Sequence, residues 1–273
     1  MSIEISRSFV IRTLRRLKIK PRWYKGQVFI CDPYPFYRLV NLANVTSSDV
    51  VYEIGSGLGF LTSILAQKAK KVISIEIERK FYNFCKGIFK RIDNIELVLG
   101  DATKHPVPRE ANKVVSSIPY SISKAIFLKL VKATNIETIA IICQKEFYEK
   151  VTAKPRESRY GYLSILCKML MENVYKETIP QEYFYPRPKV TSVIAVFKRK
   201  KNSPLDEGEI ELFIDFLKAI FTYRRKKLKK ALKISGIEDV ERIDENLLDK
   251  PVLLLEPSEA LEVFKAIEPI YSS

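Results

Sequence analysis

Short runs rich in Val and Ile alternate with amphipathic stretches between residues 33 and 145 of this chain. The runs are Asp49–Ile54, Lys71–Glu76, Ile95–Leu99, Lys113–Ser117 and Thr138–Cys143, and the stretches between them include Leu58–Ala69 and Arg79–Ile92. Apolar strands that alternate with helices are typical of a parallel sheet with helices on both faces. The sequence therefore predicts an α/β fold, with further strands at Val174–Ile179 and Val190–Phe197 and a tight turn at residues 183–188 between them.

The pattern changes after Arg199, where residues 200–209 contain Asn, Ser, Pro, Asp and Gly and predict a linker. Beyond this linker, five apolar residues recur at the spacing of one helical face: Ile210, Phe213, Ile214, Leu217 and Phe221. We therefore expect a basic N-terminal arm at residues 1–25, the α/β domain at residues 26–200 and a small all-α domain at residues 205–273.

The formal net charge of the chain is +15, and its isoelectric point is about 9.5. A solvated surface can carry excess charge without a partner, but an imbalance of this size favours a polyanion such as nucleic acid. The segment from Arg7 to Lys25 is basic and lacks acidic residues, which is also a property of mitochondrial transit peptides. Because this segment runs directly into sequence with the pattern of folded structure, we interpret it as part of the mature protein.

The four cysteines, Cys31, Cys85, Cys143 and Cys167, are widely separated, and the chain has a single histidine, His105. No Cys-x-x-Cys pair is present, so we expect no metal site. Free buried thiols are typical of a reducing compartment, and no apolar run reaches the roughly 18 residues of a membrane span. We therefore expect a cytoplasmic protein that has no membrane partner.

A glycine-rich turn follows the first predicted strand, with glycines at positions 55, 57 and 59. Glycine lets the backbone turn sharply and approach a ligand closely, so this turn is a candidate site for a nucleotide-like cofactor. The dinucleotide fingerprint has its third glycine three positions after the second, where this chain has Phe60. A purely structural turn is the alternative interpretation of the glycines alone.

Acidic residues stand at the ends of three successive predicted strands: Glu53, Glu76 and Asp101. A carboxylate at a strand end can accept hydrogen bonds from ribose hydroxyls, and Asp101 is placed to meet an adenine amino group. Three carboxylates would repel a pyrophosphate, but they suit a cofactor that has a cationic centre and no phosphate. The pattern therefore favours S-adenosylmethionine (SAM) over NAD.

The predicted strand Lys113–Ser117 leads into the segment Ser117-Ile118-Pro119-Tyr120. Proline interrupts the ladder of strand hydrogen bonds, and the tyrosine provides a flat face for stacking. An exocyclic amine is a weak nucleophile, and two acceptors for its N–H groups favour the geometry that methyl transfer requires. The side-chain oxygen of Ser117 and the backbone carbonyl of Ile118 can provide these acceptors, although an ordinary strand end is the alternative interpretation.

Together and in this order, the motifs resemble those of the KsgA-type rRNA adenine dimethyltransferases, a family that includes the Erm methylases and the mitochondrial transcription factor B proteins. The resemblance, to an archaeal-like member, runs from about Gly26 to Lys230. The matching segments are Gly26-Gln-Val-Phe-Ile30, Glu53-Ile-Gly-Ser-Gly-Leu-Gly59, Glu76, Asp101-Ala102, Gln144–Phe147, Ala153–Ser164, Phe184–Ser192 and Phe221–Leu228. The resemblance implies a Rossmann-like SAM-dependent methyltransferase sheet at residues 26–200.

The resemblance also implies roles for individual residues. The implied cofactor-binding residues are Gln27, Val28, Ile30, Glu53, Gly55, Gly57, Glu76, Ile77, Asp101, Ala102 and Ser117. The implied catalytic residues are Ser117, Ile118, Pro119, Tyr120 and Phe184, of which Phe184 would stack on the target base from the side opposite Tyr120. The family's catalytic turn usually begins with Asn or Asp, and the shorter Ser117 departs from it at a cost of about 1–3 kcal/mol.

Cations are concentrated in two parts of the chain. Six of the seven residues from Arg224 to Lys230 are cationic, on a predicted helix whose Leu228 and Leu232 face inward. The N-terminal arm interleaves its cations with Trp23 and Tyr24, which suits phosphate contact combined with base stacking. A solvated face is the alternative for either run. The expected RNA-binding residues are Arg22, Lys25, Arg187, Lys189, Arg224, Arg225, Lys226 and Lys227.

The resemblance implies methyl transfer from SAM to N6 of two adjacent adenosines in the 3′-terminal hairpin of small-subunit rRNA, with a role in small-subunit biogenesis. We expect a monomer that binds the assembling 30S-type subunit. An Erm-like methylase of large-subunit rRNA would share the same motifs. A weakly catalytic assembly or transcription protein that retains the fold is the non-enzyme alternative, and Ser117 is the feature that most favours it.

Overall fold

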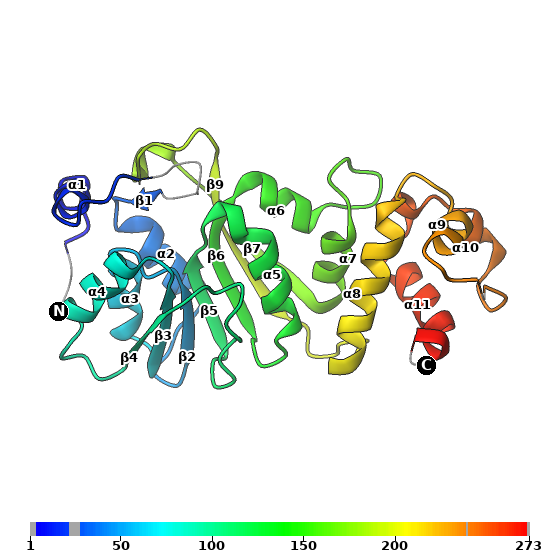
Figure 1. Cartoon of the computed structure of the whole chain (residues 1–273), viewed down its shortest axis with the longest axis horizontal. Helices are drawn as coiled ribbons and strands as arrows, with labels where there is room; N and C mark the ends of the chain where they lie inside the picture. Colours follow the sequence, from blue (N-terminus) through cyan, green and yellow to red (C-terminus); the bar gives the residue numbers. More distant parts are fainter. Residues whose placement is uncertain (1–3, 22–27, 239, 272–273) are drawn as a thin grey trace. The chain divides into compact units, whose positions relative to one another are not determined.

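The computed structural model describes residues 4–21, 28–238 and 240–271, and the side chains of these residues as far as 267 (Figure 1). The chain divides into two compact units. The first unit consists of Met1–Tyr148 and Asn173–Arg199, and the second unit consists of Glu149–Glu172 and Lys200–Ser273.

A seven-stranded sheet forms the centre of the first unit, in the order β4-β3-β2-β5-β6-β9-β7. Its strands are β2 (Val50–Ile54), β3 (Lys71–Glu76), β4 (Ile95–Leu99), β5 (Lys113–Ser117), β6 (Thr138–Gln144), β7 (Met171–Ile179) and β9 (Ser192–Arg199). The five predicted strands from β2 to β6 are confirmed and run parallel. The expectation of a parallel sheet is wrong at β9, which pairs with β6 antiparallel.

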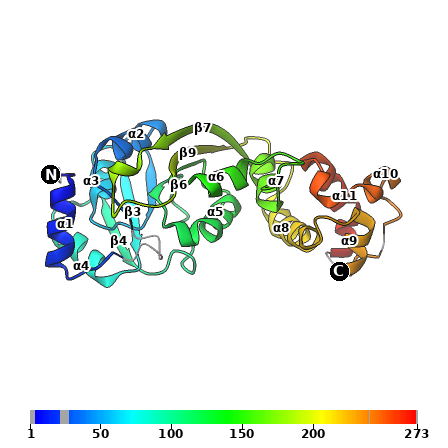
Figure 2. The same ribbon diagram turned by 90° about the horizontal axis from the view of Figure 1, so that it is seen from above.

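Helices cover both faces of this sheet. They are α2 (Tyr34–Leu42), α3 (Phe60–Ala66), α4 (Arg79–Ile88) and α5 (Ser123–Lys132). Figures 1 and 2 show α2 and α5 on opposite faces. The alternating pattern predicted helices on both faces of a sheet, and the family resemblance implied the Rossmann-like arrangement that is found. Its parallel strands finish along one edge. Beside the main sheet, β1 (Phe29–Ile30) and β8 (Phe184–Tyr185) form a small antiparallel pair.

The start of the chain forms a helix that packs on the first unit, whereas the sequence suggested an arm. Helix α1 (Arg7–Arg16) buries Val10 and Leu14, which belong to the same apolar core as Phe60. Val10 and Leu14 are one helical turn apart, so they form an apolar stripe on one face of α1. Burial of this stripe removes hydrocarbon surface from water and favours the packing of the helix. The expected RNA contacts of this region at residues 22–25 lie outside the described residues.

The second unit is helical, as the sequence predicted for its C-terminal part. It contains α7 (Tyr162–Leu170), α8 (Glu207–Thr222), α9 (Leu228–Ile234), α10 (Glu245–Asp249) and α11 (Pro257–Tyr271). The five apolar residues predicted to share a face of α8 are all buried. Unlike the expected division at residues 200–205, the second unit also includes Glu149–Glu172, because α7 packs against α8 and α11.

The cationic segment Arg224–Lys230 is not one continuous helix, so that part of the sequence interpretation is wrong. Helix α8 ends at Thr222, and residues 223–227 form a turn before α9 begins at Leu228. The backbone of this turn pairs with a distant segment: the N–H of Leu253 donates to the carbonyl of Arg224 at 2.9 Å. The expectation that Leu228 and Leu232 face inward is confirmed, since both are fully buried.

Candidate active site

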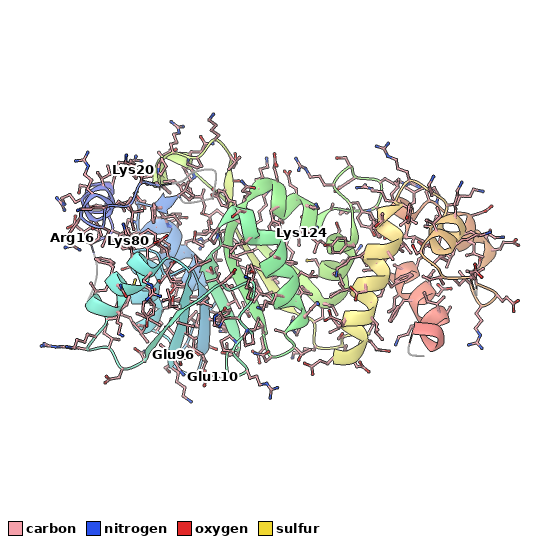
Figure 3. The ribbon with its side chains drawn as sticks, in the orientation of Figure 1. Arg16, Lys20, Lys80, Glu96, Glu110 and Lys124 are labelled. Atoms are coloured by element: carbon pink, nitrogen blue, oxygen red, sulfur yellow. The ribbon has the colours of Figure 1, made fainter. Side chains whose placement is uncertain are left out.

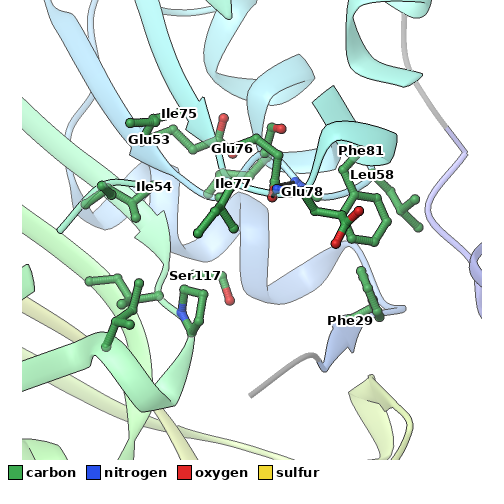
Figure 4. A pocket seen from close by; sticks show the side chains of 18 of the residues that line it. Phe29, Glu53, Ile54, Leu58, Ile75, Glu76, Ile77, Glu78, Phe81 and Ser117 are labelled. Carbon is green, nitrogen blue, oxygen red and sulfur yellow. Dashed lines mark hydrogen bonds between the residues drawn. The ribbon is translucent and has the colours of Figure 1, made fainter. Parts of the chain in front are cut away.

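A cavity of about 850 Å³ lies in the first unit at the edge where the parallel strands finish (Figure 4). It brings together most of the residues predicted from the sequence: Val28, Ile30, Glu53, Gly55, Gly57, Glu76, Ile77, Asp101, Ala102, Ser117, Ile118, Pro119 and Tyr120. Gln27 lies outside the described residues. Residues far apart in the chain meet here because adjacent parallel strands end at the same edge of a sheet.

The glycine-rich turn after β2 forms one wall of the cavity. Gly55 and Gly57 have φ angles of 85° and 52°, a region that side-chain-bearing residues rarely adopt. A Cβ atom built on either glycine would have no neighbour within 4 Å, so both positions leave open space beside the backbone. Gly59, in contrast, is required by packing, because its Cβ would lie 2.8 Å from the ring of Phe89.

Glu53 is almost completely buried at the end of β2, with 1% of its surface exposed. The hydroxyl of Thr62 donates a hydrogen bond to Oε2 at 2.5 Å, whereas Oε1 has no partner among the described residues. Burial raises the pKa of this carboxyl to about 7. A buried carboxylate oxygen without a donor is costly, and a ligand that supplies a cation or an N–H group would offset that cost.

Glu76 at the end of β3 is held by backbone donors. The N–H of Gly57 donates to Oε2 at 2.9 Å, and the N–H of Glu78 donates to Oε1 at 2.8 Å. Each carboxylate oxygen can accept a second hydrogen bond, so the group still has capacity for two hydroxyl donors. Burial raises the pKa of Glu76 above its usual range. Next to it, Ile77 lines the cavity with 69% of its surface exposed, which provides an apolar surface beside the carboxylate.

Asp101 begins the loop after β4. The N–H and the hydroxyl of Thr103 both donate to its Oδ1, at 2.9 and 2.7 Å, and these hydrogen bonds lower the pKa of Asp101. The residue that anchors this loop is Lys129 on α5, which is not among the site residues expected from the sequence. Its ammonium donates to the carbonyl oxygens of Ala102 at 2.9 Å, Thr103 at 3.3 Å and His105. A signal was present only in the apolar pattern of α5, in which a lysine stands among buried neighbours.

The segment Ser117–Tyr120 forms the opposite wall, and Figure 4 shows Ser117 across the cavity from Glu53 and Glu76. The N–H of Ile118 continues the pairing with β6 by donating to the carbonyl of Ile142 at 3.1 Å. The regular strand then stops at Pro119. The hydroxyls of Tyr120 and Ser192 lie 2.5 Å apart, and burial raises the pKa of Tyr120 to about 12. The phenol is therefore neutral at physiological pH, and its position is fixed by β9.

Phe184 does not line the cavity, so the prediction that it stacks on a base finds no support in this structure. Its side chain is 1% exposed and belongs to the apolar core of the first unit. The reason is its place in β8, where it pairs with Ile30 and its side chain is directed into the core. The guanidinium of Arg7 fixes the same segment by donating to the carbonyls of Glu182 at 2.6 Å and Phe184 at 3.1 Å.

The residues predicted to bind RNA are divided between the two units. Arg187 and Lys189 are exposed beside β8 in the first unit, and residues 224–227 belong to the second unit. Three lysines line the cavity: Lys18, Lys20 and Lys80. Lys18 and Lys20 belong to the N-terminal segment whose cations were expected to contact phosphate, whereas Lys80 lies outside the residues expected to bind RNA. Lys80 on α4 also holds the segment after α1, because its ammonium donates a hydrogen bond to the carbonyl of Lys18 at 3.1 Å. The described residues contain no group of three or more His, Cys, Asp or Glu side chains suited to a metal ion.

A Rossmann-like sheet, a glycine turn beside a cavity and carboxylates at successive strand ends define the class of SAM-dependent methyltransferases. The model of the family described as ribosomal RNA adenine dimethylase matches residues 18–268. The chain therefore belongs to the ribosomal RNA adenine dimethylase family. It is an enzyme that uses SAM to methylate rRNA.

Individual relatives agree with this assignment. Over 259 residues, the chain is 36% identical to a probable ribosomal RNA small subunit methyltransferase A of Pyrococcus abyssi, which covers 92% of this chain and 93% of the relative. A crystal structure of a dimethyladenosine transferase from Plasmodium falciparum is similar with a TM-score of 0.75 and 25% identity, over 88% of this chain and 98% of that chain. The 23S rRNA methyltransferase ErmE is similar with a TM-score of 0.63 and 26% identity, over 88% of this chain and 99% of that chain.

Proposed function

We propose that this enzyme transfers methyl groups from SAM to N6 of two adjacent adenosines in the 3′-terminal hairpin of small-subunit rRNA. The observation that carries this proposal is the cavity itself, in which the Ser117–Tyr120 turn faces the carboxylates of Glu53 and Glu76. The small-subunit target is supported by the name of the relative from Pyrococcus abyssi, which matches over nearly the full length of both chains.

The residues present fit SAM. The orphaned Oε1 of buried Glu53 suits a cationic ligand, and the open space beside Gly55 and Gly57 admits one close to the backbone. Glu76 retains two acceptor positions for the ribose hydroxyls, and Asp101 is an acceptor for the amino group of adenine. When bound, SAM supplies an electrophilic methyl group on a cationic sulfur. Burial of the site strengthens the attraction of its carboxylates for that charge.

The Ser117–Tyr120 turn would hold the target base. The N6 amine can donate one hydrogen bond to Oγ of Ser117 and one to the carbonyl of Ile118, while the base stacks on Tyr120. These two acceptors orient the nitrogen lone pair toward the methyl group. The amine becomes acidic as it is methylated, so its proton can pass to water, and the turn itself contains no strong base. Alignment and electrostatics therefore provide the catalysis.

The distribution of charge supports the approach of RNA to this edge of the sheet. Figure 3 shows Lys20, Lys80 and Lys124 toward the edge where the strands finish, and Glu96 and Glu110 toward the opposite one. Glu96 and Glu110 both form salt bridges with Lys71, at 2.7 and 2.8 Å. A positive edge around the cavity would attract the phosphate backbone and position it, while the cavity selects the base.

The proposed partner is the assembling small subunit, and we propose that the enzyme acts on it as a monomer in the cytoplasm. None of the helices in the described part of the chain combines the length and apolar composition of a membrane span. The four cysteines are free and buried, which is consistent with a reducing compartment.

A second candidate is methylation of large-subunit rRNA, which is favoured by the similarity to ErmE. The two targets are distinguished by incubating the enzyme with tritiated SAM and either small or large subunits that lack the modification. We expect label in the small subunit. Label confined to the large subunit would support the second candidate. Absence of label from both would support a weakly catalytic assembly protein.

A further inference from the structure

The second unit contains a cavity of its own, with a volume of about 360 Å³. Three segments of that unit form it: the loop between α6 (Lys145–Thr152) and α7, the outer face of α7, and the segment between α10 and α11. The lining residues are Lys154, Pro155, Arg156, Lys168, Lys250, Leu254 and Glu256.

The lining carries four cations and one carboxylate. Lys250 is neutralised by Glu259, whose two carboxylate oxygens both lie 2.7 Å from its ammonium. Lys154, Arg156 and Lys168 have no salt-bridge partner in the described part of the chain. Cations gathered around one concave surface repel one another, and an anion that binds between them removes this repulsion.

The walls of this cavity are fixed by hydrogen bonds. The N–H of Lys154 donates to Oε2 of Glu157 at 3.0 Å, within the loop before α7. Tyr160 closes the same loop against the segment before α11, because its hydroxyl donates to the carbonyl of Leu255 at 2.6 Å and its ring is 1% exposed. On the α7 side, the ammonium of Lys200 donates to the carbonyl of Lys168 at 2.6 Å. These hydrogen bonds fix the backbone at Lys154 and Lys168, so the loop and the helix that carry the cations are preformed before a ligand binds.

The composition of the lining points to phosphate as the ligand. Ammonium and guanidinium groups donate to phosphate oxygens, whereas the lining offers no aromatic ring on which a base could stack. The cationic turn at residues 224–227 is joined to the same loop, since the guanidinium of Arg224 donates to the carbonyl of Ser158 at 3.2 Å. Phosphates that follow one another along a nucleic acid would match a cationic cavity next to a cationic turn.

We propose that this cavity binds a backbone phosphate of the RNA substrate and thereby anchors the RNA on the second unit, apart from the methylation site. The inference rests on the proposed function for the identity of the polyanion. The contact is independent of base sequence, so it contributes affinity and position but not the choice of the methylated adenosine.

The test is a triple variant, Lys154→Gln, Arg156→Asn and Lys168→Gln, in the full chain. Asn is chosen at position 156 because Arg156 has a φ of 75°, a conformation that Asn tolerates well. Binding of a short fluorescent RNA hairpin is measured by anisotropy as a function of salt. We expect affinity to fall about tenfold at low salt, and the slope of log affinity against log salt to decrease by about 0.7–0.9 for each lost phosphate contact.

The matched control removes the same three charges from exposed positions of the second unit outside the cavity, with Lys201→Gln, Lys233→Gln and Arg242→Gln. This control should keep nearly the native slope and affinity, and both variants should bind S-adenosylhomocysteine as the native protein does. Equal losses in the two variants would show that only net charge matters and would overturn the proposal. A native slope in the cavity variant would overturn it as well.

A second measurement uses the native protein, so it does not depend on the folding of a variant. Lysines are acetylated with and without the RNA hairpin, and the modified peptides are quantified by mass spectrometry. RNA should protect Lys154 and Lys168 several-fold more than Lys233, and equal protection would overturn the proposal. The hairpin need not be a methyl acceptor, so failure of the small-subunit methylation assay would leave this result interpretable.

Discussion

At the level of single residues, the proposed chemistry of the cavity depends on one side-chain oxygen of Glu53 and one of Ser117. Glu53 has one carboxylate oxygen bonded to Thr62 and one without a partner, so it is prepared for a cationic ligand. Ser117 lines the same cavity, and its Oγ is the proposed acceptor for the target amine, at the position where the family motif that the sequence resembles usually has Asn or Asp. For Glu53, the expected chemistry follows from the oxygen that the surrounding structure leaves without a donor.

Replacement of Ser117 tests the proposed catalytic turn. A serine hydroxyl is shorter than an Asn side chain and must orient its own proton, so Ser117→Asn should retain or raise the rate of methyl transfer. A better acceptor worth about 1–3 kcal/mol would correspond to roughly a ten- to hundredfold gain at most. The measurement is the initial rate of tritium incorporation from labelled SAM. A collapse of the rate would show that the serine is specifically required.

The pH dependence of cofactor binding tests Glu53. Burial raises the pKa of Glu53 to about 7 from an ordinary value of 4.5. The folded protein without cofactor therefore prefers the protonated carboxyl, and the contribution of Glu53 to folding stability is fully present below pH 4.5 and is lost as the pH rises through 7. Cofactor binding has the opposite dependence, because the cationic cofactor prefers the ionised carboxylate. We expect SAM to bind about tenfold more weakly at pH 6 than at pH 8 in calorimetry.

The control for this experiment is Glu53→Gln, which should bind SAM weakly and with little dependence on pH between 6 and 8. Glu76→Gln is the comparison at the neighbouring carboxylate, whose pKa is also raised by burial. If Glu53→Gln retained the native pH slope, Glu53 would not be the group that titrates.

At the level of elements, the sheet and the glycine turn could be predicted because they depend on local patterns. Strands β3, β4 and β5 have the predicted bounds, since Val- and Ile-rich runs between helices specify a parallel sheet. The packing of α7 on α8 and α11, and the position of Phe184 in the core, depend on contacts between distant segments. Single-sequence patterns do not contain that information, so they predicted neither the inclusion of Glu149–Glu172 in the second unit nor the burial of Phe184.

Helix α5 connects the two sides of the active site. It follows directly after the Ser117–Tyr120 turn, and its Lys129 holds three carbonyls of the loop that carries Asp101. Helix α5 thus links the Ser117–Tyr120 turn, which precedes it in the chain, to the Asp101 loop, which it holds by hydrogen bonds. A change in α5 should therefore affect the cofactor side of the cavity even though Lys129 does not line it.

Substitution of Lys129 tests this connection. Lys129→Met keeps the aliphatic stem but leaves the carbonyls of Ala102 and Thr103 without their donor, so the Asp101 loop should loosen. We expect the affinity for S-adenosylhomocysteine to fall about tenfold in calorimetry, which corresponds to about 1.4 kcal/mol. Lys129→Arg should recover part of the loss. The matched control is Lys124→Met on the same helix, and an equal loss in that variant would contradict a specific role of Lys129.

For the whole molecule, the net charge of +15 predicted a polyanionic partner, and membership in an rRNA methylase family agrees with it. Composition could indicate the kind of partner but not where it binds. The structure provides two candidate positions, which are the lysines that line the cavity of the first unit and the cationic cavity of the second unit. The two proposals together give each unit its own surface for the RNA backbone and place methyl transfer in the first unit.

The most direct test is to identify the modified nucleotides. Small subunits that lack the modification are incubated with enzyme and SAM, and the 3′-terminal hairpin fragment of their rRNA is digested and analysed by mass spectrometry. We expect N6,N6-dimethyladenosine at two adjacent positions, and its loss with Tyr120→Ala, which removes the stacking surface while leaving the cofactor side of the cavity intact. An unmodified hairpin, or full modification by the Tyr120→Ala variant, would contradict the proposed site and reaction.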